Sequence, residues 1–523
     1  MIRQLTSHLR VFDDMNWRLI ILVAFAASVS GLAYAGDADS LLFESIEIRA
    51  GYFSRNATVG YENNPALQLN RFETSLSDIS VGYAVRTSDE AIMTQEGKGQ
   101  RGFSIDSRTY MPLSERSVVW GRASYENADR LDVRWCDAVD YQLISPYVLG
   151  DSVGGDLSMQ RYSFGGGYAA ASGRWRFGVS AFYRAEIDSR NRDPRLKVIV
   201  SDLDLRLGTS YALSQNYSIG LSTALRVYNQ DNDLDFYNPV NNIRTYALTG
   251  VGTYSSRFSG NNSNASYSFV GFSTGLQLHP STEYGFAFSG GYSYYKMEQV
   301  LKDLNNLTLG EVSSHTFSAQ AAKNFRIGSV SLGIVADVWW NRRIAGENLF
   351  GTSVGNSYEK ISTRYFYYND KVDCNIRIPL EISFDDSRLT VAPKLAFAYS
   401  HENYRRPHRD IEWRSISPAL ELNYVSKCGS KWLLEYGIIG GWRSGTRMNL
   451  ELDGMNPLSS LYTMVVNDYG HASSDGGYCS ASIEADRIIA SSVALYCRAC
   501  GGVTTYSGYP TSYDISLSVG VKF

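Results

Sequence analysis

The chain has 523 residues, 44% of them hydrophobic and 20% charged, and its 49 basic and 53 acidic residues leave a net charge of −4. This near balance gives no indication of nucleic-acid binding. The length alone fits two or three soluble domains, or one large β-barrel, since barrels grow by adding hairpins rather than cores.

The N-terminus has the pattern of a secretion signal. Leu19–Ala27 is a short apolar run, Arg18 precedes it, and Ala33-Tyr34-Ala35 supplies small residues at a cleavage site. We therefore expect export through the inner membrane and cleavage near Ala35; a start at Met15 would give a more compact signal peptide. The alternative is a buried N-terminal helix. No later stretch reaches the roughly 18 consecutive apolar residues that predict a transmembrane helix.

Long segments downstream alternate apolar with polar residues. Because side chains of a strand point to opposite faces in turn, the alternation over Val372–Phe384 predicts a strand with one apolar and one polar face. The apolar face carries Val372, Cys374, Ile376, Ile378, Leu380, Ile382 and Phe384, and the polar face carries Lys371, Asp373, Asn375, Arg377, Glu381 and Ser383.

Three features favour a membrane barrel over a soluble β-sandwich, which would also alternate. The segments exceed the usual strand length of about five or six residues, aromatic residues such as Trp432 and Trp442 end the apolar faces, and connections alternate between short and long. Short connections include Ser172-Gly173, Pro280-Ser281 and Asp385-Asp386, whereas the long ones span roughly 127–159, 230–266, 344–368 and 447–470.

These patterns predict an all-β, antiparallel transmembrane outer-membrane β-barrel over residues 71–523, with about 18 strands and a range of 16–20. Residues 36–70 are left over. We expect them at or inside the periplasmic mouth, or as the first strand of a larger barrel, with Phe43–Phe53 as a candidate strand.

The C-terminus ends on an apolar strand face. This pattern looks like the insertion signal that the barrel-assembly machinery reads in outer-membrane proteins. Its residues are Tyr513, Ile515, Leu517, Val519, Val521 and Phe523.

The opposite faces of the alternating segments carry charges of both signs, which should point into the lumen. Mixed charges stabilise barrel walls through cross-strand pairs and also line aqueous pores. We expect wall stabilisation as the main role and solute selectivity as the second. The residues are Arg176, Arg184, Glu186, Asp202, Asp204, Arg206, Asp337, Lys371, Asp373, Arg377, Glu381, Lys394, Glu421, Glu435 and Arg443.

Two loop clusters are candidates for metal binding. Asp231, Asp233 and Asp235 resemble the opening of a calcium loop, although the glycine and the distal glutamate of an EF-hand are absent. His401 and His408 lie near carboxylates, but neighbouring arginines oppose a cation. Solvated loops are the simpler interpretation. We predict no resident cofactor apart from this candidate structural calcium, and no enzyme, since no Gly-x-Ser-x-Gly or His-Glu-x-x-His motif is present.

Two of the six cysteines are candidates for a disulfide. Cys479 and Cys497 fall on the apolar faces of neighbouring segments, and a turn centred near Ile488 would place them opposite each other. The alternative is two lipid-facing thiols that act as small apolar residues. A slip of one residue in the register would separate the pair.

The mature chain resembles a group of uncharacterised outer-membrane β-barrel proteins of Bacteroidetes over nearly its full length. The resemblance rests on Arg192–Arg195, Ser201–Leu205, Leu225–Asn229 and Asn305–Leu309. Separately, Asn64-Pro65-Ala66 resembles an element near the N-terminus of long-chain fatty acid channels, which implies a hydrophobic ligand.

We therefore expect a transport channel or ligand-uptake component of the Gram-negative outer membrane. The alternative is a non-conducting barrel that binds a partner at the surface. Expected partners are outer-membrane lipid or lipopolysaccharide, the assembly machinery during insertion, and a small-molecule ligand or a protein; no nucleic acid is expected.

Overall fold

The computed structural model describes residues 38–53, 59–238, 243–260, 264–282, 284–353, 355, 357–490 and 492–523. The predicted signal peptide lies outside the described residues and stays a prediction. Within the described residues, nineteen strand segments form one antiparallel sheet, and a smaller three-stranded sheet lies at one end.

The large sheet is a closed barrel of 18 strands, counted over the described residues, which confirms the predicted fold class and strand number. β16 continues β15 past Pro379, since both segments pair with β14 and β17. The strands are β1 (Leu76–Ser88), β2 (Gly99–Ser114), β3 (Ser117–Val133), β5 (Gly155–Ser172), β6 (Trp175–Ser189), β7 (Arg195–Ala212), β8 (Tyr217–Asp235), β11 (Ala265–Pro280), β12 (Gly285–Leu301), β13 (Leu307–Ile327), β14 (Val330–Phe350), β15 (Lys360–Arg377), β16 (Leu380–Ser383), β17 (Ser387–Tyr404), β18 (Arg409–Cys428), β19 (Trp432–Leu452), β20 (Gly476–Ala490), β21 (Val493–Tyr506) and β22 (Tyr509–Lys522).

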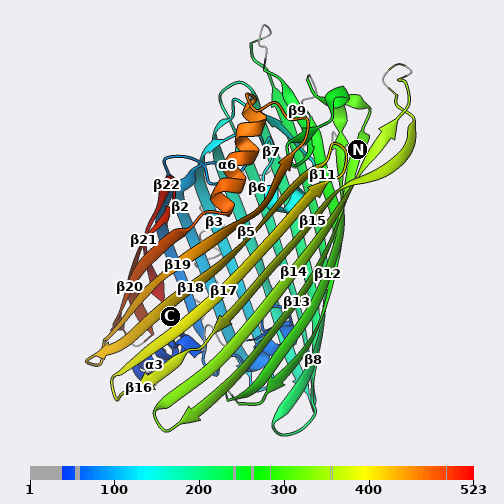
Figure 1. The fold of residues 1–523 in the computed structure, drawn as a ribbon. Helices are drawn as coiled ribbons and strands as arrows, with labels where there is room; N and C mark the ends of the chain where they lie inside the picture. Colours follow the sequence, from blue (N-terminus) through cyan, green and yellow to red (C-terminus); the bar gives the residue numbers. More distant parts are fainter. Residues whose placement is uncertain are drawn as a thin grey trace.

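The first and last strands close the barrel. β1 pairs with β22 in an antiparallel register that sets Val81 opposite Val519. Closure removes the unpaired edge of the sheet, so the backbone groups of the wall are hydrogen-bonded within it (Figure 1). A β-sheet crosses the hydrocarbon of a membrane only when it is closed in this way, because hydrocarbon contains no water to bind unpaired N–H and C=O groups.

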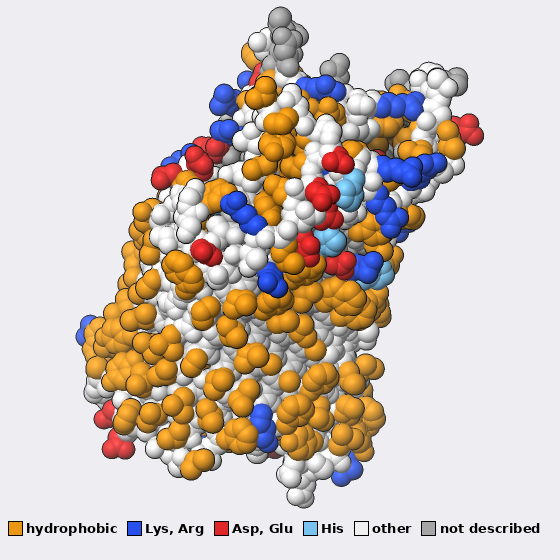
Figure 2. Space-filling model, in the orientation of Figure 1, with side chains coloured by type: hydrophobic (Ala, Val, Ile, Leu, Met, Phe, Trp, Pro, Cys, Tyr) orange, Lys and Arg blue, Asp and Glu red, His pale blue; other side chains and the backbone are white. Residues whose placement is uncertain are grey.

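The outer surface carries the apolar face of each strand. On β22, Ile515, Leu517 and Val519 are 53–66% exposed. Apolar side chains cover the lower part of the face seen in Figure 2, and charged side chains gather at its upper end. An exposed apolar band on a closed, even-stranded barrel is the exterior of an outer-membrane protein.

The connections differ at the two ends. Those at the lower end of Figure 1, such as 173–174 and 384–386, join strands with two to four residues, whereas those at the upper end include 134–154, 236–264 and 453–475. Since outer-membrane barrels have short periplasmic turns and longer external loops, we call these the periplasmic end and the outer end.

An N-terminal segment, residues 38–53 and 59–75, lies inside the periplasmic end (Figure 1). It contains α3 (Ala38–Ala50) and the 3-10 helix η1 (Pro65–Asn70). The candidate strand over Phe43–Phe53 is therefore wrong. Leu42, Ile46 and Ala50 recur at the four-residue spacing of one helix face, and that face packs against Val425, Leu433 and Ile488 of the wall.

The outer end is filled by a second structure, which we call the outer plug: residues 134–154 and 243–260. Its β4 (Val148–Asp151) pairs with β9 (Thr245–Gly250), which pairs with β10 (Thr253–Tyr254). It also holds α5 (Tyr141–Ile144) and η2 (Ser256–Phe258). Its apolar side chains share one buried core with inward residues of the wall, among them Trp135, Ile144, Tyr147 and Leu149 of the plug and Leu196, Val198, Tyr267, Met297 and Tyr367 of the strands.

Helix α6 (Ser460–Ala472) lies at the outer end (Figure 1). Ser459 caps it by accepting a hydrogen bond from the Tyr462 backbone N–H. Leu461, Met464 and Val465 join the core of the outer plug. A short helix, η3 (Lys302–Leu304), follows β12. No helix in the described part of the chain is long and apolar enough to cross a membrane.

Candidate functional site

A cavity of about 850 Å³ lies inside the barrel, between the N-terminal segment and the wall strands β1–β3, β5–β8, β19, β20 and β22. Charged groups dominate its lining: the described residues contribute eight basic and seven acidic side chains. The basic ones are Arg49, Arg71, Arg108, Arg122, Arg184, Arg206, Arg226 and Lys522, and the acidic ones are Glu62, Asp78, Asp202, Asp204, Glu435, Glu484 and Asp486.

The tripeptide Asn64-Pro65-Ala66 seats the N-terminal segment in the wall beside this cavity. The fully buried Asn64 donates from Nδ2 to Thr209 O at 3.1 Å and to Gln277 Oε1 at 2.9 Å. Its Oδ1 accepts from the Ala66 backbone N–H at 3.0 Å. The opposing wall positions include Gly178 and Gly208, where an added methyl group would overlap the tripeptide.

This seat does not favour the hydrophobic ligand that the resemblance to fatty acid channels implied. The tripeptide binds the wall itself, because the Asn64 side chain is hydrogen-bonded to wall residues and the tripeptide packs closely against wall glycines. The cavity beside it is lined by paired and unpaired charges, which cost free energy when an apolar ligand displaces their water.

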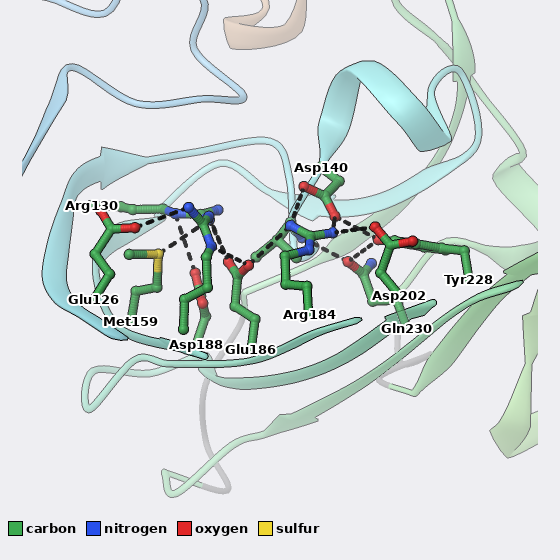
Figure 3. Close-up of polar contacts among 12 residues, drawn as sticks. Glu126, Arg130, Asp140, Met159, Arg184, Glu186, Asp188, Asp202, Tyr228 and Gln230 are labelled. Atoms are coloured by element: carbon green, nitrogen blue, oxygen red, sulfur yellow. Dashed lines mark hydrogen bonds and ion pairs between the residues drawn. The ribbon is translucent and has the colours of Figure 1, made fainter. Parts of the chain in front are cut away.

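A network of ion pairs joins neighbouring strands of the wall (Figure 3), and two of its members, Arg184 and Asp202, line the cavity. Glu186 on β6 is buried and accepts from three arginines: Arg130 at 2.5 Å, Arg161 at 2.8 Å and Arg184 at 3.1 Å. The arginines come from β3, β5 and β6, so the network ties three strands together. A buried carboxylate needs this degree of pairing to remain stable away from water.

The outer plug joins the network through Asp140. Arg184 donates to both oxygens of the Asp140 carboxylate, at 3.1 Å from Nη1 to Oδ1, and the Tyr228 hydroxyl adds a bond of 2.9 Å. Arg184 also contacts Asp202 at 3.4 Å. Burial alone would raise the pKa of Asp140, but the hydrogen bonds and charge of Arg184 outweigh it and hold that pKa below its usual value. We call this group of contacts the Asp140 latch.

A second plug contact is fully buried. Arg190, just after β6, pairs with Asp151 of β4 at 2.7 Å and with Asp137 of the plug at 3.3 Å. Burial and the charge of Asp151 raise the pKa of Asp137 well above its usual value. The pKa of Asp151 is lowered, because Arg190 and hydrogen bonds offset the effect of burial. The two buried carboxyls therefore share the single positive charge of Arg190.

The charged residues predicted to face the lumen fall into two groups: some line the cavity, and others contact the wall, the outer plug or a helix. Arg184, Asp202, Asp204, Arg206 and Glu435 line the cavity. The other contacts link wall to wall, plug or helix: Glu186 binds three arginines, Asp337 binds Asn375, Glu381 binds Thr390, Glu421 binds Tyr52, Lys371 reaches Gln142 of the plug, and Arg443 reaches the carbonyls of His471 and Ala472. Arg176, Asp373, Arg377 and Lys394 lie on β6, β15 and β17.

The candidate metal ligands do not gather into a cluster. Asp231, Asp233 and Asp235 are not in a loop, because β8 extends to Asp235, and Asp231 pairs with Lys302 at 2.8 Å. His401 contacts Asp410 at 2.9 Å, and His408 contacts Glu451 at 3.0 Å. Over the described residues, no group of three or more His, Cys, Asp and Glu side chains is placed to hold a metal ion.

The predicted alignment of Cys479 with Cys497 is wrong. Cys479 lies opposite Val503, and Cys497 lies opposite Ala485. The hairpin turns three residues later than expected, after Ala490, so the two thiols are separated along the strands. Both are exposed, and all six described cysteines are free.

Most of the contacts of the outer plug could not be predicted from the sequence. Asp140, Asp151 and Arg190 lie in or beside irregular segments, where no periodicity indicates which side chains will meet. Arg108 and Arg122 lie in alternating segments, and their polar faces were a signal that could have placed them in the lumen.

The closed 18-strand barrel, its apolar exterior and its charged interior define the class: an outer-membrane β-barrel with a lumenal cavity. Within that class, the chain belongs to DUF6850, a family of unknown function, whose model matches residues 65–523. The chain matches no curated protein sequence.

Several solved outer-membrane barrels are similar to this chain at low identity. The chain is similar to CdiB from Acinetobacter baumannii, with 8% identity and a TM-score of 0.36 over 86% of this chain and 60% of that one. It is also similar to the copper transporter OprC, with 7% identity and a TM-score of 0.38 over 85% and 81%. It is similar as well to the siderophore receptor PiuA from Acinetobacter baumannii, with 9% identity and a TM-score of 0.39 over 85% of this chain and 82% of the receptor. The chain thus spans less than two thirds of CdiB.

Proposed function

We propose that this protein is an uptake barrel of the outer membrane that binds a small polar solute in the central cavity. The observation that carries the proposal is the cavity itself: about 850 Å³, with charges of both signs, between a periplasmic segment and an outer plug. A wall needs cross-strand ion pairs, but it does not need an open space of this size, and cavities that present a few polar groups are where small ligands bind.

In this proposal the described conformation is closed. The outer plug fills the external half of the barrel with a shared apolar core, and the N-terminal segment contacts the wall at the other end. A barrel of about 18 strands encloses a lumen wide enough for an aqueous path once a plug moves. Opening therefore requires the outer plug to leave the wall.

A second candidate function is a non-conducting barrel that presents its outer surface to a partner. The continuous core that joins the plug, α6 and the wall favours it, because so much buried apolar surface resists opening. Both candidates are binding or transport functions rather than enzymatic ones. Recognition of lipopolysaccharide, insertion by the assembly machinery, signal-peptide cleavage and the kinship with Bacteroidetes proteins stay predictions.

Reconstitution separates the two candidates. We would replace residues 137–151 with a short Gly-Ser linker and compare this variant with the wild type in planar bilayers and in liposomes loaded for solute uptake. The uptake barrel predicts discrete conductance and entry of small polar solutes for the linker variant. A matched control replaces the exposed hairpin 405–408 and should behave as the wild type. A folded linker variant that conducts nothing would support the non-conducting barrel.

A further inference from the structure

Two arginines face each other across neighbouring strands in the cavity wall. Arg108 on β2 and Arg122 on β3 are direct cross-strand partners, and both line the cavity and are exposed to it. Like charges placed directly opposite each other destabilise a sheet. Within the described part of the chain, neither arginine forms an ion pair, whereas Arg184, Arg206 and Arg226 on the following strands each do.

One carboxylate directly opposes this pair of arginines. On the other side of Arg108, the register places Asp78 of β1. Lys522 of β22 also faces Asp78, but its ammonium group donates to Glu484 and Asp486. Two arginines therefore share one facing carboxylate. Asp106, the next residue of β2 with the same orientation, accepts a bond from Ser104 at 2.8 Å and does not line the cavity. Arg122 packs over the Phe182 ring at 4.6 Å.

Two more arginines approach from the N-terminal segment. The guanidinium carbons of Arg49 and Arg71 lie 4.4 and 5.3 Å from the centre of the Phe72 ring, and Arg49 also lies over Tyr110. Arg49 donates to the backbone carbonyls of Thr74 and Leu76. The Nε–H groups of Arg49 and Arg71 are buried without a hydrogen-bond partner. Buried donors of this kind normally find an acceptor.

We propose that Arg108 and Arg122, with Arg71 and Arg49, bind an oxyanion group, phosphate or carboxylate, of the solute that enters the cavity. Planar guanidinium groups donate in pairs to such anions, and an anion between Arg108 and Arg122 would turn their repulsion into attraction. This inference rests on the proposed function for the origin of the ligand. The binding itself can be measured whether or not the barrel conducts.

The test uses the full mature barrel in detergent. Its thermal unfolding is followed at constant ionic strength with inorganic phosphate, with succinate, or with glucose as a neutral control. We expect phosphate or succinate, but not glucose, to raise the unfolding temperature of the wild type. Phosphate alone would assign a phosphorylated solute, and succinate alone a carboxylated one. Titration calorimetry should show binding about tenfold or more weaker in Arg108→Gln and in Arg122→Gln.

Two variants separate ligand binding from a structural role. Arg122→Lys keeps the charge but not the paired donors, so it should retain part of the binding. Arg101→Gln removes an arginine of β2, the strand that carries Arg108. Arg101 pairs with Asp129 and does not line the cavity, so this variant should bind as the wild type does. Without anion, Arg122→Gln should be at least as stable as the wild type, since it removes a like-charge pair.

The proposal would be overturned by a wild type that no anion stabilises, or by glutamine variants that keep the full response. It would also be overturned if Arg122→Gln unfolded more easily without anion, because the pair would then be structural. Anion binding without any permeation in the reconstitution assay would retain this site and reject uptake. Permeation without anion binding would retain the uptake function and reject this anion site.

Discussion

Arg184 of β6 donates to both carboxylate oxygens of Asp140, a residue that the outer plug holds in the left-handed backbone region at φ +57°. The same arginine contacts Glu186 and Asp202 of the wall, and Asp202 lines the cavity. One side chain therefore connects the plug, the wall network and the cavity. Under the proposed uptake function, a solute in the cavity would affect the closure of the barrel through the Asp140 latch.

Removing the latch should loosen the outer plug. Asp140→Asn keeps the size of the side chain but removes its charge, and a charged hydrogen bond of this kind contributes roughly 1.5–3 kcal/mol. We expect faster proteolysis within 134–154 and brief conductance openings in bilayers. Asp132→Asn, which breaks the more exposed pair with Arg134, should change little. Equal behaviour of the two variants would contradict the role of the latch.

Arg190 should matter more for stability than any exposed arginine of the loops. In Arg190→Gln, Asp137 and Asp151 lose their shared cation while they remain buried, and breaking a buried pair costs about 3–5 kcal/mol. We expect the 134–154 plug to become sensitive to protease while the strands stay folded. Arg195→Gln, which breaks the exposed pair with Asp193, is the control and should remain resistant.

The glycine seat of the N-terminal segment can be tested with one methyl group. Gly208→Ala should displace Asn64 from the wall, because the added carbon would overlap Asn64 Oδ1. A cysteine introduced at Gln68 should then react faster with a water-soluble thiol reagent. Gly501→Ala is the matched control, since the nearest atom to its added carbon is 4.0 Å away. An unchanged rate in Gly208→Ala would show that the segment is not held there.

The docking of α6 should depend on pH through Asp468. Burial raises the pKa of this carboxyl from 3.8 to about 7, although Thr94 donates to it. Below about pH 4 the docked and released forms are both protonated, so the shift has no effect. As the pH rises from 4 to 7, docking increasingly disfavours the ionised carboxylate, and stability falls.

Asp468→Asn should remove this dependence. Residues 453–475 should resist proteolysis better in Asp468→Asn than in the wild type, and this difference should grow from pH 4 to pH 7. His471 has its pKa lowered to about 4 by burial and by Arg443, so it destabilises docking on the acid side instead. Because both proteins contain His471, its effect cancels in the comparison. A difference that does not change with pH would contradict the raised pKa of Asp468.

The register of β20 and β21 predicts which cysteine pair can be oxidised. Val503→Cys should form a disulfide with Cys479, because the two positions are direct cross-strand partners. The native pair Cys479 and Cys497 should stay reduced under the same oxidant. Mass spectrometry of peptides from alkylated protein measures both, and a native Cys479–Cys497 disulfide would show that the register is wrong.

The wall of this barrel could be predicted because its physics is local. Each long strand meets hydrocarbon on one face and water or polar groups on the other, so alternation such as that of Val372–Phe384 appears directly in the sequence. Strand number follows from counting such segments. The two classes of connection follow in the same way, from short turns such as Asp385-Asp386 and long ones such as 447–470.

The interior was decided by the tertiary structure. Whether Asp140 meets Arg184, whether Asn64 finds Gly208, and whether Arg108 faces Arg122 depend on contacts between segments far apart or on the register between strands. A shift of a few residues at one turn separated Cys479 from Cys497 and left the alternation of both strands unchanged. The sequence by itself thus determined that the chain forms an outer-membrane barrel, because alternation needs only neighbouring residues. What fills that barrel, and which charges remain unpaired within it, only the folded chain could decide, because those contacts join residues that no periodicity relates.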